Sequence, residues 1–365
     1  MCMDSVKISM DNSQEYKNIL IIKLSSLGDI CHALPSLAAL RKLYPKAKIS
    51  WAVNKQFADL LVGHPLLDEV IIIEQKSLTK GSFGARYQYF KKLRAELKAH
   101  NFDLVLDLQG LFKSSVIALM TGCPNRYGYW ELREGSRLFT KAIKGAYAQE
   151  HVIQRYLDVI RFFGSDVQEP EFVLPDIDVH EQELHKLGLD GQYIVLAPAT
   201  SWASKEWPAD NYVELGIKLI NGGWKLVLVG GTTDIAKSAA IVEQIQNSVG
   251  DIDNKITDLT GKTTLKQLMA VCKNASLYIS GDTGPLHIAA CTEVPIIAMY
   301  GPTMPDRTGP YISKNTVSNK KTIVLSGKAD CAPCRRRVCS PLKCMQSISV
   351  DEVYAAAEHL LCDKK

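Results

Sequence analysis

The sequence lacks the features that mark several common classes of protein. Its 365 residues contain no window of 18 consecutive apolar residues, which argues against a transmembrane helix. The formal net charge is only +4, from 43 Lys and Arg against 39 Asp and Glu, which is too small for a chain coated to bind nucleic acid. The fingerprint GxGxxG is missing after the first expected strand, which disfavours an NAD-linked dehydrogenase.

The N-terminal residues lack the basic start and apolar run of a signal peptide, and we expect residues 1–17 to form a flexible tail. Ten cysteines without a secretion signal indicate reduced thiols in a cytoplasmic protein more than a disulfide scaffold. Six are scattered singly, as small core residues are. The other four lie close together and are considered below.

What the sequence does contain predicts a two-domain α/β protein. A chain of 365 residues is too long for one comfortable core, and 46% hydrophobic residues are enough to build two. Short β-branched runs alternate with segments of helical periodicity, which is typical of parallel βαβ units. We expect domains at 18–178 and 179–349, a linker at 168–178, and a C-terminal helix within 350–365. Strands are predicted at 18–24, 48–53, 69–73, 104–108, 193–197, 225–229, 277–280 and 295–300. Helices are predicted at 30–43, near 57–61, and at 87–99, 113–119, 152–163, 209–221, 234–246, 265–272, 285–291 and 350–361.

Ligands of such sheets bind beyond the carboxyl ends of the strands, so the loops there carry the candidate chemistry. The first is KLSSLGD, residues 23–29, which places Asp29 between a strand and a helix. An aspartate in this position is a favoured helix N-cap, and it can also serve as a general base. Both interpretations of Asp29 stay open from the residues alone.

Two loops in the second half predict a site for a nucleotide diphosphate. In SGDTGPLH, residues 280–287, two glycines and Pro285 at a helix start favour an anion site, although an ordinary turn with a buried His287 has the same pattern. In the loop after 193–197, Thr200, Ser201 and Lys205 can hold phosphate oxygens, although such a lysine is more often simply solvated. The loop GGTTD at 230–234 can also approach a nucleotide, although hairpin-like turns have the same composition, and we expect the three loops to converge on the diphosphate site.

Five segments together resemble glycosyltransferase family 9, the lipopolysaccharide heptosyltransferases, and most closely the heptosyltransferase I branch. They are KLSSLGD (23–29), DLQGLFKS (107–114), ATSWASKEWP (199–208), GDTGPLHIAA (281–290) and YGPT (300–303). The resemblance extends from Ile19 to Leu361. It implies a GT-B fold, in which two Rossmann-like doubly wound parallel-sheet domains face a central cleft. The N-terminal domain would bind the acceptor and the C-terminal domain the nucleotide sugar.

The resemblance also implies a mechanism. Asp29 matches the catalytic aspartate, which would deprotonate an acceptor hydroxyl as it attacks ADP-heptose with inversion, and Lys205 would neutralise the departing ADP. The other donor-binding residues would be Thr200, Ser201, Asp282, Thr283, Gly284 and His287. No cofactor is required for catalysis, because Lys205 and helix-end amides take the place of a metal.

Alternative functions are a related transferase that uses another nucleotide sugar or a later core heptose acceptor and, outside the enzymes, a nucleotide- or nucleic-acid-binding module. The presence of both Asp29 and Lys205 favours the enzyme. Weak overall charge and missing recognition motifs argue against a nucleic-acid partner.

The segment 76–98 has seven Lys and Arg against the single acid Glu96, with four aromatic residues between them. Such a run is usually a solvated helix face. The implied acceptor, a Kdo-bearing lipid A or inner-core lipopolysaccharide, gives it an anionic partner, as does the inner leaflet of the cytoplasmic membrane. We therefore expect a cytoplasmic protein associated peripherally with that membrane. The acceptor-binding residues would be Lys76, Lys80, Arg86, Lys113, Arg133 and Arg137.

A cluster of four cysteines departs from the heptosyltransferase I pattern: Cys331, Cys334, Cys339 and Cys344. Four thiols within so short a segment can form a structural zinc site. Their spacing is unlike that of a paired zinc knuckle, so disulfides and free thiols stay as alternatives.

Overall fold

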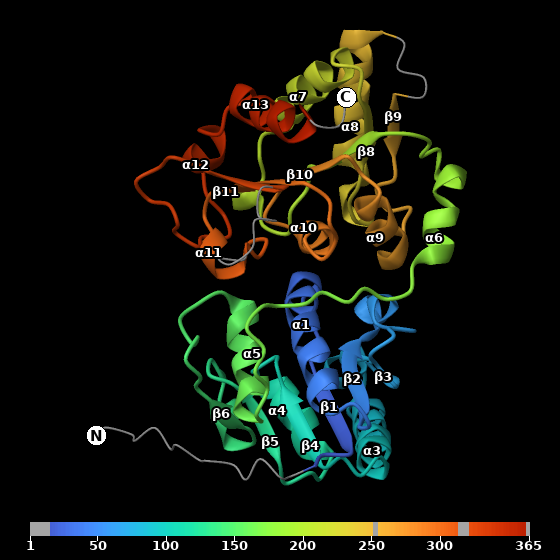
Figure 1. Cartoon of the computed structure of the whole chain (residues 1–365), viewed down its shortest axis with the longest axis vertical. Helices are drawn as coiled ribbons and strands as arrows, with labels where there is room; N and C mark the ends of the chain where they lie inside the picture. The colour runs from blue at the N-terminus through green and yellow to red at the C-terminus, as the bar shows by residue number, and fades with distance from the viewer. Residues whose placement is uncertain (1–14, 251–254, 313–320, 363–365) are drawn as a thin grey trace. The chain divides into compact units, whose positions relative to one another are not determined.

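The computed structural model describes residues 15–250, 255–312 and 321–362 (Figure 1). Most of the predicted tail, residues 1–14, lies outside the described residues. Internal contacts divide the chain into two compact units. The first comprises residues up to Ser25 and Ala33–Val173, and the second comprises Ser26–His32 and Leu174 onward. The chain passes from one to the other at Val173, within the segment predicted as a linker.

The first unit is built on a six-stranded parallel sheet in the order β3-β2-β1-β4-β5-β6. Its strands are β1 (Asn18–Ile22), β2 (Lys48–Asn54), β3 (Glu69–Ile73), β4 (Leu104–Asp107), β5 (Arg126–Tyr129) and β6 (Lys141–Ile143). Strand β1 lies at the centre and reads NILII, which is apolar and buried after its first residue, as expected for a strand covered by helices on both faces. Asp107 pairs with Ile22, so the loops after β1 and β4 leave the sheet at the same edge.

The helices of the first unit cover that sheet. They are α1 (Leu27–Leu43), α2 (Gln75–Thr79), α3 (Phe83–Ala99), α4 (Phe112–Met120) and α5 (Val152–Phe162), with 3₁₀ turns at Lys55–Leu60 and Ser136–Leu138. Beyond its first residues, α1 buries nearly every side chain. Leu93 and Leu97 anchor the second half of α3 in the core formed with β1 and β4.

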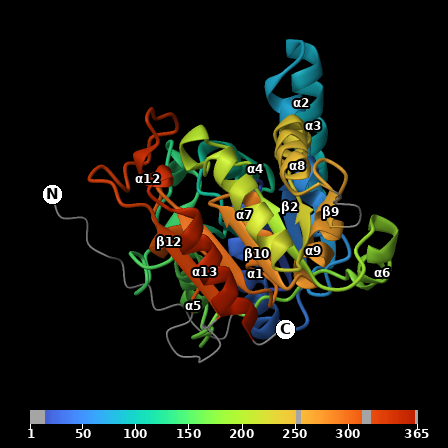
Figure 2. The same ribbon diagram turned by 90° about the horizontal axis from the view of Figure 1, so that it is seen from above.

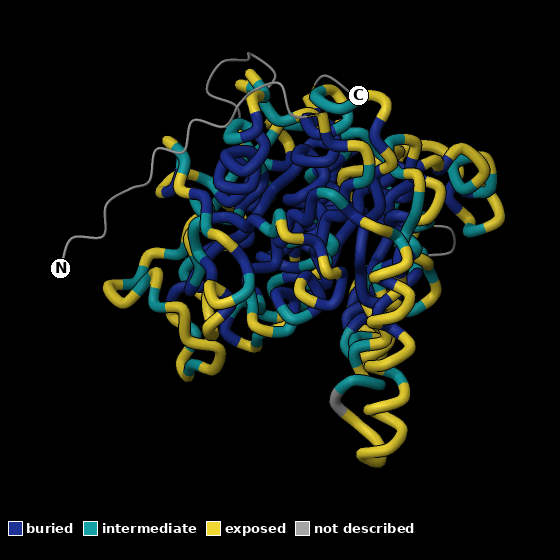
Figure 3. The backbone as a smooth tube through the Cα atoms, turned by 90° about the horizontal axis from the view of Figure 1, so that it is seen from below, coloured by how far each residue is buried: buried dark blue, intermediate teal, exposed yellow. Residues whose placement is uncertain are grey.

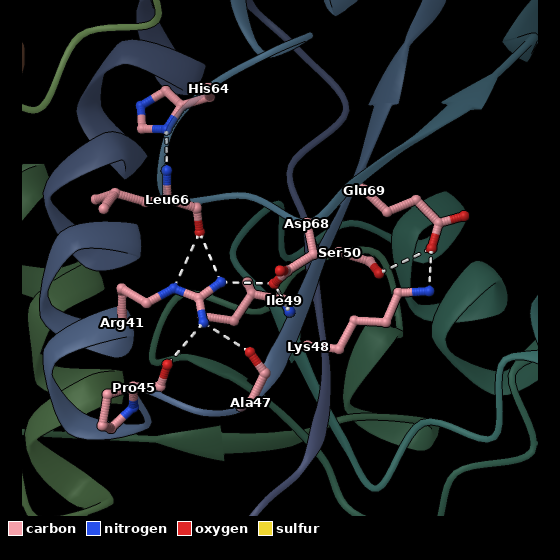
Figure 4. Close-up of polar contacts among 10 residues, drawn as sticks. All are labelled: Arg41, Pro45, Ala47, Lys48, Ile49, Ser50, His64, Leu66, Asp68 and Glu69. Carbon is pink, nitrogen blue, oxygen red and sulfur yellow. Dashed lines mark hydrogen bonds and ion pairs between the residues drawn. The ribbon is translucent and has the colours of Figure 1, made fainter.

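Arg41 fixes the C-terminal end of α1 to the residues that directly precede β2 and β3 (Figure 4). Its guanidinium donates to the Ala47 carbonyl at 2.6 Å and to Asp68 Oδ2 at 2.6 Å. The same Asp68 oxygen accepts from the Ile49 amide at 2.7 Å. A bonded, largely buried guanidinium is pre-organised by its planar fork, so α1 is held rigidly against its sheet.

The second unit repeats the architecture, with a parallel sheet in the order β12-β11-β10-β7-β8-β9. Its strands are β7 (Tyr193–Ala197), β8 (Lys225–Leu228), β9 (Ile256–Asp258), β10 (Leu277–Gly281), β11 (Ile296–Tyr300) and β12 (Thr322–Ser326). Its helices are α6 (Asp178–Gln182), α7 (Ala209–Asn221), α8 (Ile235–Val249), α9 (Leu265–Lys273), α10 (Gly284–Ala289), α11 (Pro305–Thr308), α12 (Lys343–Gln346) and α13 (Val350–Leu361), with 3₁₀ turns at Leu184–Leu187, Ala203–Lys205 and Thr232–Asp234. Trp207 and Tyr212 pack edge to face in its core, with ring centroids 5.0 Å apart.

All eight predicted strands are present, and four further strands were not predicted. The four are β5, β6, β9 and β12, all in the outer part of a sheet. β6 and β9 have only three residues each, which is too short for a periodic pattern to show. The segment predicted as a helix near 57–61 is a 3₁₀ turn at Lys55–Leu60. Helix α3 begins at Phe83, four residues earlier than predicted, because Ser82 caps it by accepting from the Ala85 amide.

Candidate active site

The candidate site of the second unit lies at the carboxyl ends of β7, β10 and β11. These strands are neighbours in the sheet, and Ser280 on β10 is in register with Ala197 on β7. The loops that leave them therefore start side by side, as the sequence predicted for the loops after β7 and β10. They carry Thr200 and Lys205 after β7, Asp282 and Thr283 after β10, and Thr303 after β11. The third loop that was predicted here, GGTTD, follows β8, which is the neighbour of β7 on its other side.

Asp282 is the residue that joins the three loops. Its carboxylate receives the Lys205 ammonium at 2.6 Å and the Thr303 hydroxyl at 2.7 Å, and His287 Nε2 lies 3.5 Å away. Only 5% of Asp282 is exposed. Burial by itself raises the pKa of Asp282, but the hydrogen bond and charge of His287, together with Lys205, hold it well below its ordinary value. The lowered pKa favours the carboxylate form of Asp282, and its ion pair positions the Lys205 ammonium.

The loop after β7 is ordered by its own polar groups. The Thr200 hydroxyl donates to the Trp202 carbonyl at 2.7 Å, and the Lys205 ammonium lies 4.4 Å from the centre of the Trp202 ring. A Cβ on Gly281 would lie 2.9 Å from the Lys205 carbonyl oxygen, so only glycine lets β10 pass this close to the loop. Lys205 is thus mostly buried and fixed by Asp282 and Trp202, unlike a solvated surface lysine.

The loop after β10 presents a helix start beside Lys205. Thr283 precedes α10, is buried, and does not use its side chain to cap the helix. Gly284 and Pro285 are the first helical residues, so the helix starts one residue earlier than predicted. Thr283, the helix-end amides and Lys205 form a set of donors suited to phosphate oxygens. Ser201 is exposed in the neighbouring loop.

The start of α1, within Ser26–His32, belongs to the second unit by its internal contacts. Asp29 lies in the first turn of α1, and its Oδ2 accepts from the Ser26 amide at 3.0 Å and the Ser26 hydroxyl at 2.8 Å. Ser26 in turn accepts from the Ile30 amide at 3.0 Å through its carbonyl oxygen. The prediction that Asp29 is the helix N-cap is therefore wrong, because α1 begins two residues earlier, at Leu27, and the half-buried carboxylate bonds back to Ser26 from within the first turn. Its role as a general base stays a prediction.

Two buried histidines lie against this segment. The His32 and His287 rings meet edge to face, with centroids 4.5 Å apart. A Cβ on Gly28 would lie 2.3 Å from His287 Cδ2, so the glycine leaves the space that the imidazole fills. Among the described residues, Nδ1 of His287 has no hydrogen-bond partner. His287 is thus a buried residue that packs against Gly28 and lies next to Asp282. Its role in ordering the donor loop stays a prediction.

A buried network in the first unit was missed by sequence reasoning, although its residues lie in two of the quoted motifs. Gln109 Oε1 accepts from the Leu24 and Ser25 amides, each at 3.0 Å, and so ties the DLQG loop to the KLSS loop. Lys23 Nζ donates to the Leu108 carbonyl at 3.0 Å and to the Tyr156 hydroxyl at 2.8 Å. The signal that could have found it is a lysine directly after a fully apolar strand.

Asp107 completes that network. It is fully buried, accepts from the Gln109 and Gly110 amides at 3.0 Å each, and accepts from the Ser114 hydroxyl at 2.9 Å. Burial raises the pKa of Asp107 from 3.8 to about 6, against the lowering effect of these hydrogen bonds. It fixes the turn into α4.

The predicted acceptor residues do not form a single cluster. A cavity of about 470 Å³ lies at the carboxyl ends of β2 and β3, and its lining includes Lys76. Lys113 reaches the edge of this cavity, since its Nζ lies 3.4 Å from Gln75 Oε1. Lys80 and Arg86 lie further along the α2 and α3 helices.

Arg133 and Arg137 follow β5, near the other edge of the first sheet from β3. Both are exposed, and the Arg137 guanidinium stacks 4.7 Å from the centre of the Trp130 ring. The sheet order therefore separates these two arginines from Lys76. It does not separate them from Lys113, because β4 pairs with β5, the Arg133 amide donates to the Gly110 carbonyl at 2.8 Å, and α4 packs against the turn Ser136–Leu138.

The four clustered cysteines are free thiols of different exposure. Cys344 is buried, Cys331 is exposed, and Cys334 and Cys339 are intermediate. Within the part of the chain that the structure describes, no three His, Cys, Asp or Glu side chains are placed to hold a metal ion. The zinc hypothesis gains no support from this arrangement and stays a prediction.

In the described ranges, no helix combines the length and the apolar character needed to cross a bilayer.

Comparison with known proteins identifies the family. The model of glycosyltransferase family 9 (heptosyltransferase) matches residues 90–345, more than half of the chain. Lipopolysaccharide heptosyltransferase 1 of Pseudomonas aeruginosa is 28% identical over 327 residues, which cover 88% of this chain and 87% of that protein. Lipopolysaccharide heptosyltransferase 3 of Escherichia coli is 27% identical over 347 residues, covering 92% and 95%.

Solved structures agree on the fold. The Escherichia coli heptosyltransferase WaaC with ADP superposes with a TM-score of 0.73 at 26% identity, covering 94% of this chain and 99% of that one. A family 9 glycosyltransferase from Veillonella parvula gives a TM-score of 0.77 at 24% identity, covering 97% and 100%. With its two parallel-sheet units and its loop cluster at Asp282, the chain belongs to glycosyltransferase family 9, the heptosyltransferases, and is a glycosyltransferase of the GT-B fold expected from the sequence.

Proposed function

We propose that this enzyme transfers heptose from ADP-heptose to the Kdo region of the lipopolysaccharide inner core, with inversion at the anomeric carbon. The observation that carries the proposal is the Lys205 and Asp282 pair, 2.6 Å apart, beside the start of α10. It places a fixed cation and helix-end donors together, which suits a nucleotide diphosphate. The similarity to heptosyltransferase 1 of Pseudomonas aeruginosa supports the choice of sugar and acceptor.

In the proposed reaction, Asp29 takes the proton of the acceptor hydroxyl as its oxygen attacks the anomeric carbon. The bond to the ADP oxygen breaks on the opposite face of the sugar, and the negative charge that develops on ADP is neutralised by Lys205. Thr200, Ser201, Thr283 and Gly284 bind the phosphate oxygens, while Asp282 and His287 order the loop. A charge that is already in place costs no reorganisation during the step, which is how such groups accelerate group transfer.

The acceptor side of the proposal rests on the first unit. The cavity at β2 and β3 has Lys55 and Lys76 in its lining, which suits the carboxylate or phosphate groups of a Kdo-bearing acceptor. Lys113 lies beside it, and the segment that carries Arg133 and Arg137 packs against α4, on the side away from the cavity's β3 strand. We further propose that the enzyme works in the cytoplasm at the inner leaflet of the cytoplasmic membrane, where a lipid-linked acceptor is available.

The test is a donor and acceptor panel. Purified protein is incubated with ADP-heptose, other ADP-sugars and UDP-sugars, each with Kdo₂-lipid A or with an acceptor that already carries one heptose, and products are identified by mass spectrometry. The proposal predicts one added heptose on Kdo₂-lipid A with ADP-heptose. Transfer only to the heptose-bearing acceptor would assign a later step, such as those of the type 2 and type 3 relatives. Transfer only from another sugar would overturn the donor.

A further inference from the structure

Helices α2 and α3 form a hairpin that stands out from the rest of its unit (Figures 2 and 3). The two helices are joined by a short turn in which Gly81 has a φ of +99°. Leu93 and Leu97 pack into the core, and the Tyr89 hydroxyl accepts from the Glu74 amide at 2.9 Å. These contacts hold the base of the hairpin. Residues 81–88, by contrast, are exposed all round.

The exposed part of α3 carries three aromatic side chains on one face. Phe83, Tyr87 and Phe90 follow the spacing of four and three residues that aligns side chains along a helix. Their exposed fractions are 83%, 59% and 37%. A helix that buries nothing is marginal in water, and exposed aromatic rings in a row are uncommon on a surface that meets only solvent. We refer to these three residues as the aromatic stripe.

Positive charge surrounds the aromatic stripe. Arg94 continues the same face and Lys91 lies beside it, whereas the helical spacing places Lys92 on the opposite side of α3. Between Lys76 and Lys98 the chain has seven Lys and Arg and one acid. Two copies of such a surface repel each other, which argues against self-association through this face.

We propose that the aromatic stripe docks on an anionic lipid bilayer, with its rings at the level of the headgroups and the neighbouring Lys and Arg on lipid phosphates. Amphipathic helices with aromatic residues on one face and Lys or Arg around them bind bilayers in this way. The inference rests on the proposed lipid-linked acceptor. It also explains the position of the cavity, because Gln75 and Lys76 at the base of the hairpin line the space assigned to the acceptor's sugar.

The test measures binding to vesicles that contain no acceptor. The full chain is sedimented with vesicles of phosphatidylcholine alone and with vesicles that also contain phosphatidylglycerol. We expect binding only to the anionic vesicles, a loss of at least tenfold in F83A/F90A, and a loss of about fivefold in K91Q, since one charge near such a surface contributes on the order of a factor of five. K92Q is the matched control, with the same charge change on another face, and should bind like the wild type.

Two further measurements separate this inference from the proposed function. Turnover of F83A/F90A on a water-soluble Kdo acceptor should equal that of the wild type, because the stripe lies outside the site. If F83A/F90A lost as much turnover on the soluble acceptor as on the lipid acceptor, the stripe would belong to the acceptor site and docking would be overturned. Docking would also be overturned if F83A/F90A bound vesicles like the wild type, or if the wild-type chain failed to bind them. Dimers in sedimentation velocity that depend on the stripe would overturn it as well. Vesicle binding without heptosyl transfer would leave docking standing and remove the proposed function.

Discussion

Replacing Asp29 with asparagine separates the two roles that this residue holds. In the structure one carboxylate oxygen holds the start of α1 by accepting from the Ser26 amide and hydroxyl. Asparagine keeps an oxygen that can accept the same amide, so the helix start should survive. It cannot take a proton from the acceptor hydroxyl. We therefore expect kcat to fall by about 10²–10⁴, the usual cost of losing a general base.

That loss corresponds to about 3–5 kcal/mol in the barrier to transfer, at 1.36 kcal/mol for each factor of ten. The thermal midpoint of D29N should change little, because the carboxylate's interaction with the helix dipole contributes only about 0.3–1 kcal/mol at a site of this exposure. D29A is the matched control, since it removes both the base and the acceptor of the Ser26 hydrogen bonds and should lose about 1 kcal/mol of stability in addition.

The assays are steady-state transfer from ADP-heptose, calorimetric titration with ADP, and thermal unfolding. ADP affinity should be unchanged in D29N, because Asp29 is assigned to the acceptor side of the reaction. Near-normal turnover in a folded D29N protein would refute the catalytic assignment and leave Asp29 with its contact to Ser26 alone. A large drop in its melting temperature would show that this contact needs the negative charge.

Three further predictions concern the buried charges and the thiols. K205M should weaken ADP binding by one to two decades, since a charge-assisted contact contributes about 1.5–3 kcal/mol. The double variant K205M/D282N should regain stability but not ADP affinity. Titration that shows normal ADP binding in either variant would remove Lys205 from the site. The pKa of Asp107 is about 6 in the folded protein against 3.8 when unfolded, so its protonation stabilises the fold below pH 3.8, and this stabilisation is lost as the pH rises through 6. D107N has no such titration, so its free energy of unfolding relative to wild type should rise by about 3 kcal/mol between acidic and neutral pH. Urea titrations measure this difference, and parallel pH profiles for the two proteins would contradict it. The zinc hypothesis predicts about one equivalent of zinc in protein purified without added metal, and a loss of both zinc and thermal stability in C334S. Metal analysis that finds no stoichiometric zinc, with four alkylatable thiols at Cys331, Cys334, Cys339 and Cys344, would reject it.

The interior of both sheets could be predicted from the sequence because fully buried strands are continuous apolar runs. Strand β7 and helices α7 and α13 begin and end at the predicted residues. The outer strands could not be predicted. Strand β9, for example, has only the three residues ITD and is a strand because it pairs with β8. Pairing partners far apart in the chain leave no periodic signal.

The candidate site shows the same division. The loops after β7 and β10 could be identified because glycine, proline and hydroxyl residues there have few other uses. The ion pair between Lys205 and Asp282 joins two loops that are distant in sequence, and no local pattern specifies it. The distribution of the basic residues was also beyond the sequence, because the sheet order decides that Arg133 lies far along the edge from Lys76.

The hairpin of α2 and α3 has a consequence for local opening of the chain. The second half of α3 holds Leu93 and Leu97 in the core, so its amide hydrogens should exchange with solvent only when the unit as a whole unfolds. Residues 83–88 make no comparable burial, and their helical hydrogen bonds are open to water. One helix thus contains a slowly exchanging and a rapidly exchanging half. If amide hydrogens of the rapidly exchanging half alone became protected from exchange, this would show that a partner covers that half while the rest of the protein is unchanged.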